Sequence, residues 1–281
     1  MKLVTFNVNG LRAADRRGFR AWLDGADPDV VALQEVRAPR DAVPPAAVEG
    51  WSFVYDPGRL AGRNGVALLS KAEPRDVRPG LDEDDEFGHE GRYLEADFDL
   101  EGREVTVACL YLPKGAVASE SEAAAEKYAR KLRFCAVLSA HVTTALARAA
   151  RAGREFTLVG DFNIARTPQD LYNNKSKKPL DGFQPEERAW LTGALDLGLV
   201  DVVRALHPDE QGPYSWWSWR GASWTRDYGW RIDYHLSTPG LAAAAVRGTT
   251  DKPPSYEARI SDHAPVVVDY APAGSTPDPT V

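Results

Sequence analysis

The chain has 281 residues, of which 43% are hydrophobic and 27% charged, and its formal net charge at pH 7 is −7. A chain of this length buries roughly three quarters of the surface that its unfolded form exposes, so a hydrophobic core alone can stabilise it. The two cysteines, Cys109 and Cys135, are too few for a disulfide framework or a structural zinc site. No apolar run approaches the ~20 residues of a membrane span, and no signal peptide is evident. These features predict a cytoplasmic protein with no membrane partner.

The acidic balance argues against a protein that coats nucleic acid along its whole surface. Net charge averages over all faces, however, and an enzyme needs only one cationic face to attract a polyanion. Basic residues gather in three groups, namely Arg12, Arg16 and Arg17; Lys175, Lys177 and Lys178; and Arg220, Arg226 and Arg231. Composition therefore leaves a DNA partner open.

Short apolar runs in the first half predict buried strands at residues 3–8, 30–33 and 66–69. Phe19, Trp22 and Leu23 recur at helical spacing and predict a helix between the first two strands. Residues 93–100 and 104–112 alternate apolar and polar side chains around a short turn, which predicts a hairpin. The longest expected helix covers residues 119–152, with Ser119 and Glu122 as a capping box.

The second half adds expected strands at residues 156–159, 214–219, 231–236 and 265–270, and a helical pattern at Trp190, Leu191, Ala194 and Leu195. Many strands with interspersed helices and no internal linker predict one domain, residues 1–270, built as a sandwich covered by helices. Residues 271–281 are proline-rich and nearly free of large apolar groups, which predicts a disordered tail.

Several polar residues directly follow the apolar runs. They are Asn7, Asn9, Glu35, Asp161, Asn163, Asp233 and the triplet Ser261-Asp262-His263. One such residue is usually a side chain that meets water where a strand ends, but so many carboxylates and amides with one imidazole favour a site. Carboxylates are hard oxygen ligands suited to Mg²⁺ or Mn²⁺. Because phosphodiester cleavage needs a cation, a base for water and donors to phosphate oxygens, the residues predict metal-assisted hydrolysis.

These residues belong to six short motifs, whose order resembles that of the exonuclease III family of apurinic/apyrimidinic (AP) endonucleases, in the endonuclease/exonuclease/phosphatase superfamily. The motifs are N-V-N-G at 7–10, L-Q-E at 33–35, Y-L-P at 111–113, G-D-F-N at 160–163, G-W-R-I-D-Y at 229–234 and S-D-H at 261–263. They cover nearly the whole chain except the tail. The resemblance implies an α+β (α/β) fold, a four-layered α/β sandwich of two packed, mainly antiparallel sheets flanked by helices, with the active site at one end of the sheets.

The resemblance also implies roles for single residues. Glu35 resembles the metal-binding carboxylate, with Asp262 and Asn9 as further metal-site residues and Mg²⁺, or alternatively Mn²⁺, as the cofactor. Asn9 stands where some relatives carry aspartate. Asp161 resembles the residue that orients or deprotonates the attacking water, with Asn163 beside it. The alternative for this last pair is a turn, because Asp and Asn readily bond their own backbone.

Four further residues resemble the family's phosphate-binding groups and their supports. Asn7 matches the amide that supports the base, and Tyr111 matches the phenol that contacts phosphate, although a core tyrosine would look the same. Asp233 and His263 resemble a paired carboxylate and imidazole, and such a pair favours the imidazolium. A serine-hydrolase triad is excluded because no serine lies in a nucleophile-elbow setting.

The aromatic segment from Tyr214 to Trp230 concerns the substrate. By resemblance, Trp216, Trp230 and Ile232 wall a pocket for an extruded abasic sugar, whereas Trp217 and Trp219 are expected in the core. Arg231 and Lys114 are expected to contact the substrate. Arg220, Arg226 and residues 175–178 would follow the DNA backbone.

The leading hypothesis is therefore a Mg²⁺-dependent monomeric DNA repair nuclease. Its substrate would be double-stranded DNA with abasic sites or blocked 3′ ends. It would cut 5′ of an abasic site, degrade duplex DNA from 3′ to 5′ or clean 3′ ends. The first alternative is a phosphodiesterase or phosphatase of the same superfamily that acts on a non-DNA substrate. The second is a non-enzymatic interaction module on a nuclease scaffold.

Overall fold

The structure is a computed structural model that describes residues 1–60, 62–81, 86–172 and 178–274. Its first half contains β1 (Lys2–Asn7), α1 (Leu11–Arg16), α2 (Phe19–Ala26), β2 (Val30–Gln34), α3 (Pro45–Val48), β3 (Ser52–Asp56), β4 (Val66–Ser70), β5 (Asp76–Pro79), β6 (Tyr93–Leu100) and β7 (Arg103–Tyr111). Its second half contains α4 (Glu122–Arg151), β8 (Glu155–Asp161), α5 (Pro185–Asp196), β9 (Val200–Asp201), α6 (Val202–Leu206), β10 (Asp233–Ser237), α7 (Pro239–Ala243), β11 (Ala245–Thr250) and β12 (Val266–Tyr270).

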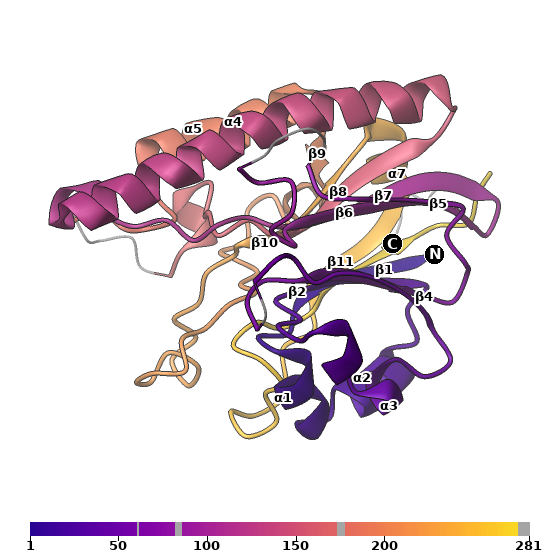
Figure 1. The fold of residues 1–281 in the computed structure, drawn as a ribbon, viewed down its shortest axis with the longest axis horizontal. Coiled ribbons are helices and arrows are strands. Elements are labelled where there is room, and N and C mark those ends of the chain that lie inside the picture. The colour runs from indigo at the N-terminus through magenta and orange to yellow at the C-terminus, as the bar shows by residue number, and fades with distance from the viewer. Residues whose placement is uncertain (61, 82–85, 173–177, 275–281) are drawn as a thin grey trace.

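The strands form two six-stranded sheets with the orders β11-β12-β1-β2-β4-β3 and β5-β6-β7-β8-β10-β9. Each sheet has one parallel pair near its centre, β1 with β2 and β7 with β8, and its other pairs are antiparallel. Figure 1 shows the sheets face to face, with α4 and α5 outside one sheet and α1, α2 and α3 outside the other. The expected four-layered sandwich of mainly antiparallel sheets is confirmed.

Alternate residues of the central strands enter different layers of the core. In β2, Val30 and Ala32 pack between the sheets, whereas Val31 and Leu33 pack against the helices of the outer layer. The second sheet divides β7 in the same way, with Val107 between the sheets and Leu110 under the helices. Both faces of these strands are therefore largely apolar, which explains why residues 30–33 appear in the sequence as a continuous apolar run.

Helix α4 covers the second sheet with an apolar stripe that includes Phe134, Leu138 and Val142. It begins later than expected. Its N-cap is Ser121, whose Oγ accepts the amide of Ala124 at 3.1 Å, so the prediction of a capping box at Ser119 is wrong.

Residues 214–219 do not form the expected strand. Trp216 makes single bridges to Trp230 and to His263, and the segment is a loop beside the sheet edge.

Ala271, at the start of the expected tail, is buried and its amide donates to the carbonyl of Ala244 at 2.8 Å, so the ordered chain extends past the predicted boundary. Residues 275–281 lie outside the described part of the chain. Within that part, no helix has the length and apolar character needed to cross a bilayer.

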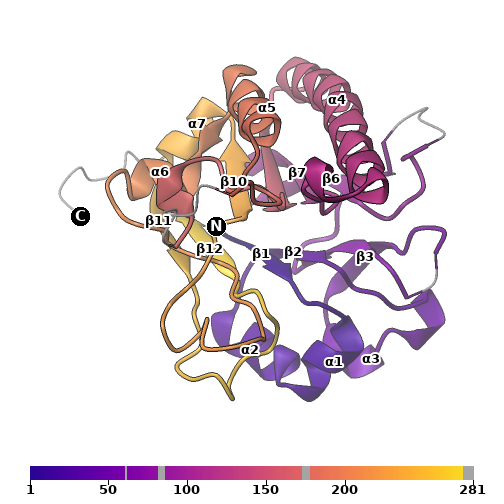
Figure 2. The ribbon, with the colours of Figure 1, turned by 90° about the vertical axis from the view of Figure 1, so that its left-hand side faces the viewer.

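The strand directions bring several polar residues to one end of the sandwich. Asn7 ends β1 and lies beside Gln34 at the end of parallel β2, with Glu35 next in the chain. In the other sheet, Tyr111 of β7 lies beside Asp161 of β8. This end faces the viewer in Figure 2. The two parallel pairs thus direct their carboxyl ends toward a common edge, as expected for a site built at strand ends.

Candidate active site

Asn7 joins the two sheets through its side-chain amide. Its Nδ2 donates to Glu35 Oε1 at 2.9 Å and to Asp161 Oδ2 at 2.8 Å. Its Oδ1 accepts the backbone amide of Asn9 at 3.0 Å. The backbone carbonyl of Asn7 accepts a hydrogen bond from Ser261 Oγ at 2.7 Å. Because these bonds engage both ends of the amide, Asn7 orients the two carboxylates on either side of it.

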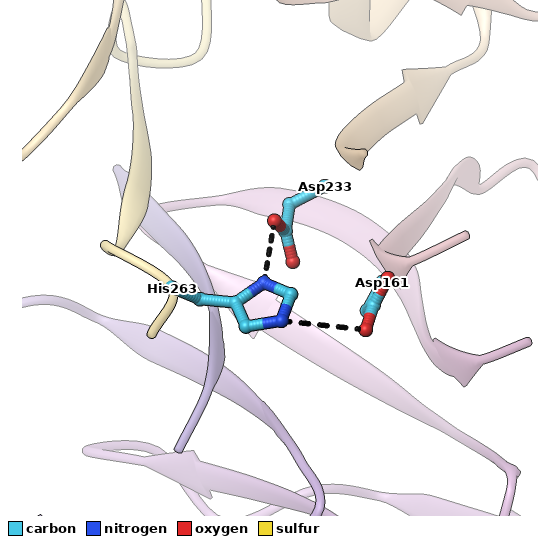
Figure 3. Close-up of side chains that lie close together, drawn as sticks. All are labelled: Asp161, Asp233 and His263. Atoms are coloured by element: carbon cyan, nitrogen blue, oxygen red, sulfur yellow. Dashed lines mark hydrogen bonds and ion pairs between the residues drawn. The ribbon is translucent and has the colours of Figure 1, made fainter. Parts of the chain in front are cut away.

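His263 lies between two aspartates, as Figure 3 shows. Its Nδ1 is 2.9 Å from Asp233 Oδ2, and its Nε2 is 3.7 Å from Asp161 Oδ2. Ser215 Oγ donates to the same Asp233 oxygen at 2.5 Å and holds the carboxylate against the ring. Asp233 itself is opposite Asp161 in the antiparallel pair of β10 and β8. The predicted carboxylate–imidazole pair is therefore present in the fold.

The charges at this site shift its protonation equilibria. Burial alone would lower the pKa of His263, but the carboxylates of Asp233 and Asp161 outweigh it and raise the pKa to about 9. Burial raises the pKa of Asp161 to about 6, with His263 opposing the shift and Asp233 adding to it. At neutral pH the histidine is thus a cation, and Asp161 is a carboxylate whose pKa is close to neutrality. Burial and the nearby Asp161 also raise the pKa of the Tyr111 phenol, which stays protonated and able to donate.

A second group of oxygen ligands lines the same cavity. Glu35 is 8% exposed, and its Oε2 is buried without an aligned hydrogen bond, although Arg37 forms an ion pair with this oxygen. Asn9 Nδ2 donates to Asp262 Oδ1 at 2.8 Å, and Trp216 Nε1 donates to Asp262 Oδ2 at 3.1 Å. Burial would raise the pKa of Asp262, but His263 and these donors outweigh it and lower the pKa, so the side chain stays anionic.

This donor set fits a small, hard cation. Glu35 and Asp262 supply carboxylates and Asn9 an amide, and the guanidinium of Arg37 is the positive charge already among these oxygens, since it pairs with Glu35 Oε2 and donates to Asn9 Oδ1 at 2.6 Å. Asp161, Asp233 and His263 also place one ligand atom each within 4.8 Å of one another. That trio is internally paired, however, because the protonated imidazole forms an ion pair with each of its two carboxylates.

The backbone beside the cavity adopts left-handed conformations at four residues that are not glycine. The φ angles are 47° at Asn9, 53° at Glu35, 51° at Arg37 and 49° at Asn163. Such angles cost energy for an L-residue and persist where the surrounding structure enforces them. Here they turn the chain sharply after strands β1, β2 and β8, which directs the side chains toward the cavity instead of along the strands.

The cavity itself has a volume of about 330 Å³. One side is aromatic, because Trp216 and Trp230 lie edge to face with ring centroids 6.4 Å apart, and Ile232 packs with both. Lys114 is exposed at the rim. The sequence-derived residues that line the cavity are Asn9, Glu35, Tyr111, Lys114, Asp161, Asn163, Trp216, Trp230, Ile232, Asp262 and His263.

Arg231 does not line this cavity, and the prediction that it contacts DNA is wrong. It is 1% exposed, its Nε donates to Asp170 at 2.6 Å, and its other two nitrogens donate to the two oxygens of Asp201 at 3.0 and 2.8 Å. Two carboxylates pair with the guanidinium, and burial keeps its remaining N–H groups from reaching a phosphate. Trp217 is in the core as expected, at 1% exposure, but the half-buried Trp219 is not.

The other residues that were expected to follow the DNA backbone lie in separate parts of the chain. Arg220 and Arg226 are exposed on the loop that follows Trp219, and residues 175–177 lie outside the described part of the chain. A second hollow next to the cavity is lined by Arg12 and Arg16 of α1 together with Arg37. Arg37 lines both spaces.

Three residues of the site were not predicted from the sequence, and Ser261 was part of a predicted motif but had no role of its own. Arg37 and Asp181 line the cavity, while Ser215 and Ser261 bond to Asp233 and Asn7. Ser261 adjoins the Asp262-His263 pair, and Arg37 follows Glu35 by two residues, so proximity to motifs could have marked both. Ser215 lies in an aromatic segment and Asp181 in no motif, so neither carries such a signal.

Known proteins are similar to this chain in sequence and in fold. Residues 4–263 match the Endonuclease/Exonuclease/phosphatase family. The chain is 32% identical to exodeoxyribonuclease III of Haemophilus influenzae over 96% of its own length and 100% of that protein. Among solved structures, an AP endonuclease from Archaeoglobus fulgidus has a TM-score of 0.82 and 30% identity, covering 96% of this chain and 99% of that one. The 3′ phosphatase NExo from Neisseria, solved bound to product DNA hairpin, has a TM-score of 0.81 and 31% identity, with the same coverage.

The chain therefore belongs to the endonuclease/exonuclease/phosphatase family and is a hydrolase of this metal-dependent class. Within the family it is similar over nearly its full length to exodeoxyribonuclease III and to AP endonucleases.

Proposed function

We propose that this protein is a Mg²⁺-dependent DNA repair nuclease that hydrolyses the phosphodiester 5′ of an abasic site in duplex DNA. The same site would serve 3′-to-5′ exonuclease and 3′-end-cleaning reactions, because each is the attack of water on a phosphate ester. The observation that carries the proposal is the convergence of Glu35, Asn7, Asp161, His263 and Asp233 at one end of the two sheets, beside an aromatic-walled cavity. The similarity to exodeoxyribonuclease III and AP endonucleases supports it.

In this mechanism Asp161 removes a proton from the attacking water. Its pKa of about 6 keeps it ionised at neutral pH and basic enough to accept the proton. Asn7 and the backbone amide of Asn163, which donates to Asp161 Oδ1 at 2.8 Å, hold the carboxylate in one orientation. The base is therefore fixed before substrate arrives.

His263 and Tyr111 bind the phosphate. The imidazolium, kept charged by Asp233, donates to a nonbridging oxygen that gains charge as water attacks. The Tyr111 phenol donates to the same phosphate group. The guanidinium of Arg92 stacks over the Tyr111 ring, with its Cζ 4.8 Å from the ring centroid. The water oxygen forms a bond to phosphorus as the bond from phosphorus to the 3′ oxygen breaks. The leaving 3′ oxygen takes a proton from solvent and becomes a hydroxyl, and Asp161 afterwards releases to solvent the proton that it took from water.

Glu35, with Asp262 and Asn9, would hold the cation. When bound, Mg²⁺ supplies Lewis-acid stabilisation of the charge on the leaving 3′ oxygen. A carboxylate pair with an amide oxygen is the ligand chemistry that Mg²⁺ and Mn²⁺ share.

Trp216, Trp230 and Ile232 would select the abasic sugar. A deoxyribose without its base can turn out of the helix and pack against these apolar side chains, whereas a normal nucleotide must first unpair and unstack. The preference for the abasic site therefore arises from size and from the lower cost of extrusion.

Cleavage of a synthetic duplex tests the proposal. The 5′-labelled duplex carries one tetrahydrofuran abasic analogue, and the control duplex has a normal nucleotide at that position. We expect one incision 5′ of the analogue in Mg²⁺, none in excess chelator, and none at that position in the intact duplex. An intact abasic duplex in the presence of Mg²⁺ contradicts the proposed activity.

Two variants assign the activity to this site. Asp161→Asn should lower kcat by about 10²–10⁴-fold while binding of the duplex persists. Asp209→Asn removes an exposed carboxylate that does not line the cavity and should cleave like the wild type.

A further inference from the structure

A fully enclosed ion pair lies behind the wall of the catalytic cavity. Lys131 of α4 and Glu187 of α5 approach to 2.6 Å between Nζ and Oε1, and both side chains have zero exposure. Removing two charges from water is costly, and a buried pair of this kind is commonly no more stabilising than apolar side chains of similar volume. Stability alone therefore does not account for these two residues.

The lysine reaches from the helical layer to the catalytic loop. Its Nζ donates to the carbonyl oxygen of Asn163 at 2.9 Å. Asn163 in turn donates its amide to Asp161 Oδ1 at 2.8 Å, and its side chain donates to the carbonyl of Leu112 at 3.0 Å. An unbroken series of contacts thus runs from Glu187 through Lys131 and Asn163 to the proposed base.

Asn163 needs such support because its φ of 49° is in the left-handed region. Gly182 approaches its carbonyl so closely that a Cβ there would lie 2.7 Å from the oxygen. Gly115 also lies close to the ion pair, since a Cβ there would be 3.0 Å from Lys131 Cδ and 3.2 Å from Glu187 Oε1. The two glycines let the neighbouring loops close over the pair, so the carbonyl is held between Lys131 and the backbone of Gly182.

Glu187 is itself fixed at the start of its helix. Its Oε2 accepts the backbone amide of Gln184 at 2.8 Å, as the N3 residue of a capping box. One oxygen therefore closes the end of α5 while the other orients Lys131. Because Glu187 both caps α5 and pairs with Lys131, the N-terminal end of α5 fixes the position of Lys131 Nζ.

We propose that Lys131 and Glu187 are positioning residues, which fix the carbonyl of Asn163 and through it the Asp161 carboxylate in the geometry required for attack on the phosphate. The proposal rests on the proposed function, and it concerns how the base is held. Since neither side chain reaches solvent, neither can contact DNA.

The double variant Lys131→Met/Glu187→Gln separates positioning from folding. Methionine and glutamine keep the side-chain volumes, no charge is left unpaired, and the glutamine carbonyl can still accept the amide of Gln184. We expect a thermal midpoint near that of the wild type, a kcat on the abasic duplex lowered by about 10- to 100-fold, and an unchanged KM and Kd for DNA. The matched control is Lys127→Met, which removes an exposed lysine one turn earlier on α4 and should leave kcat, KM and Kd unchanged.

If the double variant does not fold, Glu187→Gln alone gives the test, because it keeps Lys131 but removes the charge that orients Nζ. A lowered kcat at constant KM supports the proposal in either variant. The single variant Lys131→Arg, which keeps a cationic donor beside Glu187, should have a kcat much closer to that of the wild type. A kcat within threefold of the wild type, or a loss expressed in KM, overturns it. A wild-type protein that does not cleave the abasic duplex contradicts the proposed function instead.

Discussion

Replacement of Asp161 by asparagine is expected to stabilise the metal-free protein while it slows cleavage. Burial raises the pKa of this carboxyl from 3.8 to about 6 in the folded state. A group whose folded pKa lies above its unfolded value favours folding at pH below the unfolded value, and this contribution disappears as pH rises through the folded pKa. At pH 7.5 the folded protein therefore holds an ionised Asp161 at a cost in the free energy of unfolding.

The structure sets the size of this cost. A shift of about two pKa units corresponds to about 3 kcal/mol at 1.36 kcal/mol per unit. Asparagine retains an oxygen for the backbone amide of Asn163 but presents an NH₂ group to the side-chain amides of Asn7 and Asn163, so two hydrogen bonds worth about 1 kcal/mol each are lost. The net gain is about 1 kcal/mol, which raises the thermal midpoint of a protein of this size by about 2 °C.

Thermal unfolding in excess chelator, followed by circular dichroism between pH 4 and pH 8, measures the effect. The difference between Asp161→Asn and wild type should be largest above pH 7 and should shrink as pH falls through about 6 toward 4. Asp209→Asn, at an exposed position, should stay within about 0.5 kcal/mol of the wild type at every pH. An Asp161→Asn protein that unfolds at or below the wild-type temperature at pH 7.5 would refute the claim that burial destabilises the ionised carboxylate.

Three further outcomes follow from the same contacts. Because Asp233 helps to raise the pKa of His263 to about 9, Asp233→Asn should move the alkaline limb of the kcat–pH profile to lower pH, and an unmoved limb would exclude the imidazolium role. Arg231→Met should lower the free energy of unfolding in urea by about 3 kcal/mol, since it leaves the buried Asp201 carboxylate without its cation and Asp170 with Arg204 alone, but the salt dependence of DNA binding should not change. Mg²⁺ at a hundred times its Kd should stabilise the wild type by about 2.7 kcal/mol and leave Glu35→Gln nearly unaffected; equal stabilisation of both would place the cation elsewhere.

The strands that the sequence predicted correctly are those with both faces in the core. Residues 30–33 appear as an unbroken apolar run because Val31 packs under helices while Ala32 packs between the sheets. Strand β5 (Asp76–Pro79) was missed because it lies at a sheet edge and its residues are partly or fully exposed. Its sequence has no apolar pattern to detect. Which strand lies at the edge of a sheet depends on how all the strands pair in the complete fold, so the local sequence does not reveal it.

The aromatic segment was misread for a related reason. Alternating aromatic and polar residues from Tyr214 to Trp219 favour a strand locally, but Ser215 donates to Asp233, and Trp216 bridges to both Trp230 and His263. The segment therefore follows the contour of the cavity instead of the sheet. The site residues themselves were predictable because they follow strand ends within ordered motifs, yet their spacing along the chain carries no information on the distances between them.

Arg231 shows what local sequence cannot supply. It adjoins Trp230 and Ile232 of the cavity wall, which suggested a phosphate contact, but the carboxylates that enclose it are 61 and 30 residues away in sequence. Lys131 is paired in the same way with Glu187, 56 residues away. Both cations would have counted toward a basic face, and both are neutralised behind the cavity. The described basic residues that line the cavity or the neighbouring hollow and could attract DNA there include Lys114 at the rim and Arg12 and Arg16 of α1, whereas Arg37 is paired with Glu35. On a chain with a net charge of −7, such side chains attract a polyanion where they outweigh the surrounding carboxylates, so those beside the cavity would add to the attraction of DNA at the proposed site of cleavage.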